Sequence, residues 1–165
     1  YMTKSENFKK WFGNSLTFDT DSGDVGKYYH RSRSKEIFNE FKYSGEGVIK
    51  NPYNKDHGFY FVDTKDKHHI SYIGDGIEIL VYLKIEKPFI IYDYNHGNIV
   101  DQDGKRYDAL IMSKEFTEPI LERGFDSIFI LCETAYNQYV VFHPNQIKSI
   151  ENTGEFSLQS NNIFT

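Results

Sequence analysis

The chain has 165 residues, of which 39% are hydrophobic, 26% are charged and 17% are aromatic, and its formal net charge is −5. This length suits one hydrophobic core, so we predict a single domain over residues 1–165. The negative charge argues against bulk attraction to a nucleic-acid backbone, because proteins that bind in that way present a basic face.

The N-terminal half predicts short elements joined by polar loops. Ser5 is a good helix-capping residue, and the aromatic residues after it fall on one helical face. The expected elements are a helix over Ser5–Phe12, a strand over Lys27–His30, a helix that Ser34 caps with Ile37, Phe38 and Phe41 facing inward, a loop from Gly45 to His57, and an aromatic strand over Gly58–Val62.

The C-terminal half is richer in strands. We expect strands over Ile79–Ile85, Phe89–Tyr92, Ser127–Cys132 and Gln138–Phe142, a hairpin tip at Asp101–Gly104, a helix opened by Ser113 or Thr117 that Pro119 makes start late, and a fraying polar tail over residues 152–165. Strands and helices do not alternate strictly, which favours the α+β class over a doubly wound parallel sheet.

Several generic sites are disfavoured. His57, His68 and His69 lack the surrounding pattern of a metal site, so we expect no metal. The single cysteine, Cys132, allows no disulfide framework and lies in an apolar run typical of a buried thiol. No stretch approaches the roughly 18 apolar residues of a membrane span. With no leader sequence seen, and with Tyr1 expected to be extraneous to the natural chain, we expect a cytoplasmic protein.

Three short segments place polar side chains among aromatic ones. The segments are Tyr28-Tyr29-His30-Arg31-Ser32, Gly58-Phe59-Tyr60-Phe61 with Tyr72 twelve residues after Tyr60, and Tyr136-Asn137-Gln138-Tyr139-Val140-Val141-Phe142. Each alone is ordinary, because a strand-end histidine is usually structural and an aromatic strand is usually core. Their order along the chain is more informative than any one of them.

In this order the chain resembles the ADP-ribosyltransferase superfamily, in its diphtheria-toxin and poly(ADP-ribose)-polymerase branch. The segments FKKWFGNS, VYLKIEKPF, RGFDSI and YVVFHPNQIKSIENTGEF are similar to transferase domains of multi-domain bacterial and phage proteins, so the resemblance runs from about Phe8 to Phe156. It implies two small, packed, mostly antiparallel sheets flanked by short helices around a cleft for NAD, which is a substrate.

The resemblance also implies roles for individual residues. His30, Tyr60 and Gln138 would form the catalytic set, with His30 on a ribose hydroxyl of the adenosine side and Gln138 on the 2′-hydroxyl of the nicotinamide ribose. Tyr60 and Tyr72 would sandwich nicotinamide, and Arg31 and Ser32 would hold its carboxamide. Two positions depart from the family pattern: Arg31 replaces a glycine, and Gln138 replaces a glutamate.

The expected function is that of an NAD-dependent mono-ADP-ribosyltransferase or NAD glycohydrolase. We expect slow turnover, because the neutral Gln138 offers only a dipole to the positive transition state, unless another acid such as Glu133 supplies charge. The alternatives are a non-catalytic NAD- or nucleotide-binding module, a phage-associated interaction domain, and an RNA 2′-phosphotransferase, which this acidic chain fits less well. The acceptor and the oligomeric state cannot be deduced from the sequence.

Overall fold

The computed structural model describes residues 5–32, 34–42, 58–73, 76–95, 97–110, 112–133 and 135–165, with the side chains of residues 69–73 left undescribed. The strands are β1 Tyr28–Arg31, β2 Phe59–Asp63, β3 Glu78–Leu83, β4 Pro88–Asp93, β5 Ile99–Asp101, β6 Arg106–Tyr107, β7 Ser127–Cys132, β8 Gln138–Val141 and β9 Ile147–Ser149. The α-helices are α1 Glu6–Phe12 and α2 Lys114–Glu122, and the 3₁₀ helices are η1 Thr64–Ile73 and η2 Pro144–Gln146. The α+β class is confirmed.

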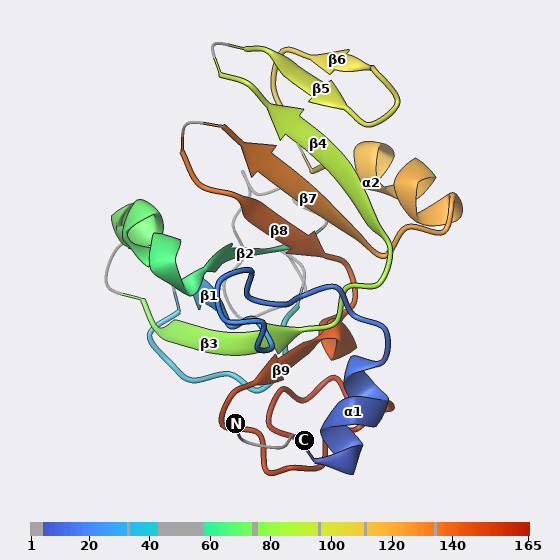
Figure 1. Ribbon diagram of the computed structural model, residues 1–165. Helices are drawn as coiled ribbons and strands as arrows, with labels where there is room; N and C mark the ends of the chain where they lie inside the picture. The colour runs from blue at the N-terminus through green and yellow to red at the C-terminus, as the bar shows by residue number, and fades with distance from the viewer. Residues whose placement is uncertain are drawn as a thin grey trace.

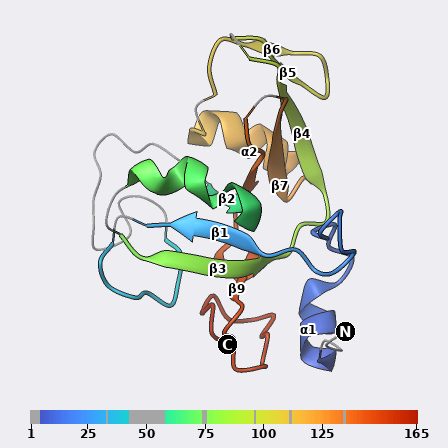
Figure 2. The ribbon, with the colours of Figure 1, turned by 60° about the vertical axis from the view of Figure 1, so that its left-hand side comes forward.

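The strands form one sheet in the order β6-β5-β4-β7-β8-β2-β1-β3-β9. β4 and β7 run parallel, and the other registered pairs run antiparallel. The sheet twists strongly, so that β4 and β7 run steeply across β1 and β3 (Figure 1 and Figure 2). The two packed sheets that we expected are therefore replaced by one sheet. Its halves join through a short contact between β1 and β2.

Apolar side chains pack on both faces of this sheet. One face of β4, β7 and β8 packs against α2, where Ile120 joins a buried cluster with Ile128 and Val140. On the other face, the core cluster under β1, β2 and β3 includes Phe61 and is closed by Ile163 from the end of the chain. In the part of the chain that the structure describes, no helix is long and apolar enough to cross a membrane.

Local capping accounts for both α-helices. The Ser5 hydroxyl accepts a hydrogen bond from the Phe8 N–H, which confirms the expected first helix. Ser113 caps α2 in the same way through the N–H of Phe116. The late start that we expected from Pro119 is wrong, because the helix begins at Lys114 and includes the proline.

Two expectations about the chain ends and loops are wrong. Residues 34–42 contain no helix: the Ser34 hydroxyl bonds with the backbone of Glu36, Ile37 is 81% exposed, and Phe41 turns into the core. The polar tail does not fray, because the carbonyl of Ile163 accepts from the N–H of Ser149 and the Ile163 side chain is buried. The capping chemistry of Ser34 and the polar composition of the tail were thus each outweighed by contacts with distant residues.

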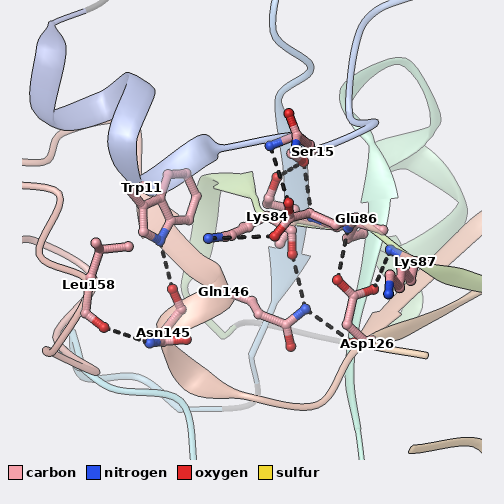
Figure 3. Close-up of polar contacts among 12 residues, drawn as sticks. Trp11, Ser15, Lys84, Glu86, Lys87, Asp126, Asn145, Gln146 and Leu158 are labelled. Carbon is pink, nitrogen blue, oxygen red and sulfur yellow. Dashed lines mark hydrogen bonds and ion pairs between the residues drawn. The ribbon is translucent and has the colours of Figure 1, made fainter. Parts of the chain in front are cut away.

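A polar hub joins α1, the end of β3, the start of β7 and η2 (Figure 3). The Gln146 side chain lies at its centre, and the indole N–H of Trp11 donates to the carbonyl of Asn145. A cavity of about 130 Å³ lies beside the hub. It is smaller than the roughly 300–1,000 Å³ that drug-sized ligands occupy. We therefore infer that the hub stabilises the fold and is not the ligand site.

Candidate functional site

The ladder between β1 and β2 is short, and the candidate residues lie where it ends. Tyr28 and Tyr29 of β1 pair with Asp63 and Val62 of β2. Arg31, farther along β1, is registered instead with Glu78 of β3. The two halves of the sheet thus diverge beyond Tyr29, and this divergence is where three of the sequence segments meet.

Strand register decides which candidate side chains share a face. Gln138 of β8 lies opposite Val62, and Val62 lies opposite Tyr29. Directly paired residues project to one face and neighbours along a strand project to opposite faces, so Tyr60 shares the face of Gln138. We call it the site face, defined by Tyr29, Tyr60, Val62 and Gln138. His30 follows Tyr29 and projects to the opposite face.

His30 nevertheless reaches β2 across the divergence. Its Nδ1 lies 2.7 Å from the carbonyl oxygen of Tyr60. A carbonyl only accepts, so Nδ1 carries the hydrogen and Nε2 of the neutral ring is an acceptor. The ring packs against Phe41 and Phe61, with centroids 5.0 and 5.3 Å away. This arrangement keeps Nε2 able to accept from a hydroxyl group.

Burial lowers the pKa of His30, and the hydrogen bond to the Tyr60 carbonyl opposes this only in part. The imidazole is therefore neutral near pH 7, since its ordinary pKa is 6.5. A neutral ring suits the acceptor role of Nε2, whereas protonation would convert it to a donor.

We expect the free energy of unfolding to fall as the pH drops below 6.5, the ordinary pKa of histidine. Because the folded pKa of His30 is lower, the unfolded chain binds more protons in that range, and stability is lost as the pH falls through the folded pKa. Urea unfolding between about pH 7.5 and about pH 5 measures the slope. His30→Gln should flatten it relative to the unsubstituted protein, and equal slopes would contradict the assignment.

Tyr29 is a buried phenol on the site face. Its side chain is 3% exposed, and its hydroxyl has no hydrogen-bond partner among the residues that the structure describes. Burial and then the nearby Glu78 carboxylate raise its pKa to about 12. Lys67 of η1 lies over its ring, 5.5 Å from the centroid, which brings η1 onto the site face. The sequence segment contained Tyr29, but nothing in its pattern singled this residue out.

Tyr29→Phe should leave the free energy of unfolding within about 1 kcal/mol of the original, or raise it. The reason is that the substitution removes a buried hydroxyl for which the described part of the chain provides no hydrogen-bond partner, while it keeps the ring in place. Thermal denaturation measures the effect. A clear loss of stability would instead indicate a hydrogen bond between Tyr29 and Glu78.

Arg31 and Ser32 continue β1 past the divergence. The Arg31 guanidinium donates to the Glu78 carboxylate at 2.9 Å, in an ion pair at the edge of the site face. The Ser32 N–H donates to the carbonyl of Ile77, and the Ser32 hydroxyl accepts from the N–H of Ser34. The side chains of both residues are thus engaged within the protein. Their contact with a carboxamide stays a prediction.

Gln138 begins β8 between two apolar clusters of the site face. In register it lies between Ile130, which belongs to the cluster under α2, and Val62, which packs with Tyr29. Its side chain is half-buried. Tyr60 packs against the α2 cluster, one strand away. A polar group at this position therefore has apolar walls on both sides, which strengthens any electrostatic interaction it makes.

Two other expectations concern residues around Gln138. Tyr72 belongs to η1, but its side chain lies outside the described residues, so its stacking role stays a prediction. Glu133 is exposed after the end of β7, where its N–H donates to the carbonyl of Asp93. Among the side chains that the structure describes, no group of three histidine, cysteine or acidic residues could hold a metal ion.

Comparison with known proteins identifies one family. The model of a family described as "ADP-Ribosyltransferase in polyvalent proteins" matches residues 20–156, and this range contains all the candidate residues. No curated protein and no solved structure matches the chain.

Proposed function

The chain belongs to the ADP-ribosyltransferase family of polyvalent proteins, and we propose that it uses NAD⁺ to transfer single ADP-ribose units to an acceptor. The observation that carries this proposal is the shared site face of Tyr60 and Gln138, on neighbouring strands with apolar clusters on either side. An aromatic ring next to a hydrogen-bonding amide fits a cationic pyridinium joined to a ribose.

In the proposed reaction the bond between the ribose C1′ and the nicotinamide nitrogen breaks, and nicotinamide leaves with the bonding electron pair. A lone pair of the acceptor then bonds to C1′, and the acceptor loses a proton. The transition state resembles an oxocarbenium ion, as in glycoside hydrolysis. Tyr60, together with Tyr72, would stabilise the pyridinium by cation–π contact, which contributes about 0.5–2 kcal/mol.

The remaining candidates would orient the substrate. Nε2 of His30 projects to the face opposite Tyr60 and Gln138, so it would accept from a ribose hydroxyl of the adenosine side where NAD⁺ passes the open end of the β1–β2 ladder. The tautomer that the Tyr60 carbonyl requires allows this role. The Gln138 amide would bond to the 2′-hydroxyl of the nicotinamide ribose. Because an amide carries no net charge, transfer of single units at a low rate is more consistent with Gln138 than chain extension, which needs a carboxylate to activate a ribose hydroxyl.

Nicotinamide release from NAD⁺, together with calorimetric binding of NAD⁺, tests the proposal. Tyr60→Ala and Gln138→Ala should each lower release, and Tyr92→Ala, on the exposed part of β4, is the matched control. Binding without release would instead select a non-catalytic NAD-binding module, which the neutral Gln138 favours as second candidate. If the protein neither binds NAD⁺ nor releases nicotinamide from it, both the transferase and the NAD-binding module are refuted.

A further inference from the structure

Lys148 of β9 is a fully buried cation that the proposed chemistry does not use. Its side chain is 0% exposed. Its Nζ donates to three carbonyl oxygens, those of Ser160, Asn162 and Thr165, at 2.9, 3.1 and 3.1 Å. An ammonium group has three hydrogens to donate, so the three carbonyls use its full capacity. The ion pairs among the described residues do not include it.

All three carbonyls belong to the C-terminal segment, residues 151–165. Through these three bonds Lys148 holds the segment against β9, the edge strand of the sheet. Near the end of this segment, the carbonyl of Ile163 accepts from the N–H of Ser149 at 2.8 Å, and the N–H of Ile163 donates to the carbonyl of Asn39 at 2.7 Å. Ile163 therefore links β9 to segment 34–42.

Segment 34–42 has no regular secondary structure and depends on such contacts for its position. Beyond the bonds that Ser34 makes with Ile77 and Ser32, the hydrogen bonds described between it and the rest of the chain come from the C-terminal segment, through Ile163 and Asn161. Two residues after Asn39, the buried ring of Phe41 packs edge-on against His30 at 5.0 Å.

We propose that Lys148 is a positioning residue for the candidate site: it holds the C-terminal segment against segment 34–42 and thereby fixes Phe41 on His30. The contacts run from Lys148 to Ile163, from Ile163 to Asn39, and from Phe41 to His30. Lys148 itself stays on β9, separated from β1 by β3. This proposal depends on the proposed function only in the measurements that use NAD⁺.

Lys148→Met tests the first link, because methionine fills the same space without donors. Hydrogen exchange of the Ser149 and Ile163 amides should accelerate by roughly tenfold or more, since each hydrogen bond from a charged donor contributes at least that factor. The NMR signals of the His30 ring should shift. The KM for NAD⁺ should rise several-fold with kcat nearly unchanged. Lys84→Met, which removes a partly buried lysine paired with Glu86, is the matched control and should change none of these.

Phe41→Leu tests the last link. It should shift the His30 signals and raise the KM for NAD⁺ while the Ile163 amide exchanges as before. If Lys148→Met fails to fold, Ile163→Ala is the substitute, because it removes the buried side chain that packs the same segment into the core. The NMR signals of the His30 ring must then shift as well.

Unchanged exchange in Lys148→Met overturns the proposal, as does faster exchange with unmoved His30 signals. A protein that neither binds nor cleaves NAD⁺ would refute the proposed function alone, because exchange and the His30 signals still decide the role of Lys148.

Discussion

Gln138→Glu should raise the rate of nicotinamide release by about 10²–10³-fold, which corresponds to about 2.7–4 kcal/mol of transition-state stabilisation. Gln138 is half-buried between apolar clusters on the site face. A carboxylate at this position would act on the developing positive charge of the ribose with little screening from water. Glutamate has almost the same size and shape as glutamine, so the gain would reflect charge. Initial rates at saturating NAD⁺ measure it.

Asn137→Asp is the matched control for added negative charge. Asn137 precedes Gln138, and its Oδ1 accepts from the N–H of Cys132. A carboxylate can keep that bond, so the control adds a charge one residue away. An equal gain in both variants would show that general negative charge is responsible. No gain in Gln138→Glu would remove Gln138 from the catalytic set.

Local chemistry was enough to predict many of the elements. Ser5 and Ser113 cap their helices through a neighbouring N–H, and the aromatic run that begins β2 is a strand as expected. These features depend on residues only a few positions apart. The sequence order of His30, Tyr60 and Gln138 likewise led to strands that lie side by side in the sheet.

Features fixed by contacts between distant parts of the chain were missed. Ser34 has the chemistry of a helix cap, yet burial of Phe41 and the bond from Ile163 to Asn39 determine the path of that segment. The polar tail is held by the buried Lys148, through three carbonyl oxygens, and by Ile163, whose carbonyl accepts from the N–H of Ser149. Whether one sheet or two forms depends on the short ladder between β1 and β2, which no local pattern encodes.

The end motif of the resemblance, YVVFHPNQIKSIENTGEF, serves largely to hold the fold together. Asn145, Gln146 and Lys148 all bond to backbone groups of other segments. The motif therefore contributes mainly to the fold, while the candidate chemistry depends on Gln138, just before it. This separation explains why the resemblance could indicate the fold over most of the chain and still leave the acceptor open.

Gln146→Leu should lower the free energy of unfolding by at least about 3 kcal/mol, because it leaves several buried backbone groups unpaired at roughly 1–3 kcal/mol each. Gln146 is 5% exposed. Its side-chain oxygen accepts from the N–H groups of Phe142 and His143. Its amide nitrogen donates to the carbonyls of Lys84 and Asp126 (Figure 3). Leucine has a similar volume and satisfies none of these groups. Urea unfolding measures the loss.

Gln102→Leu is the matched control, since the exposed Gln102 accepts one bond, from the N–H of Ile90, and should cost about 1 kcal/mol or less. Gln146→Glu separates donors from acceptors in the hub. Its ionised carboxylate keeps both N–H bonds but faces the carbonyls of Lys84 and Asp126, so this variant should regain stability relative to the original protein as the pH falls and the carboxyl gains a hydrogen to donate. A Gln146→Leu protein as stable as the Gln102→Leu control would mean that water, rather than Gln146, satisfies the hub.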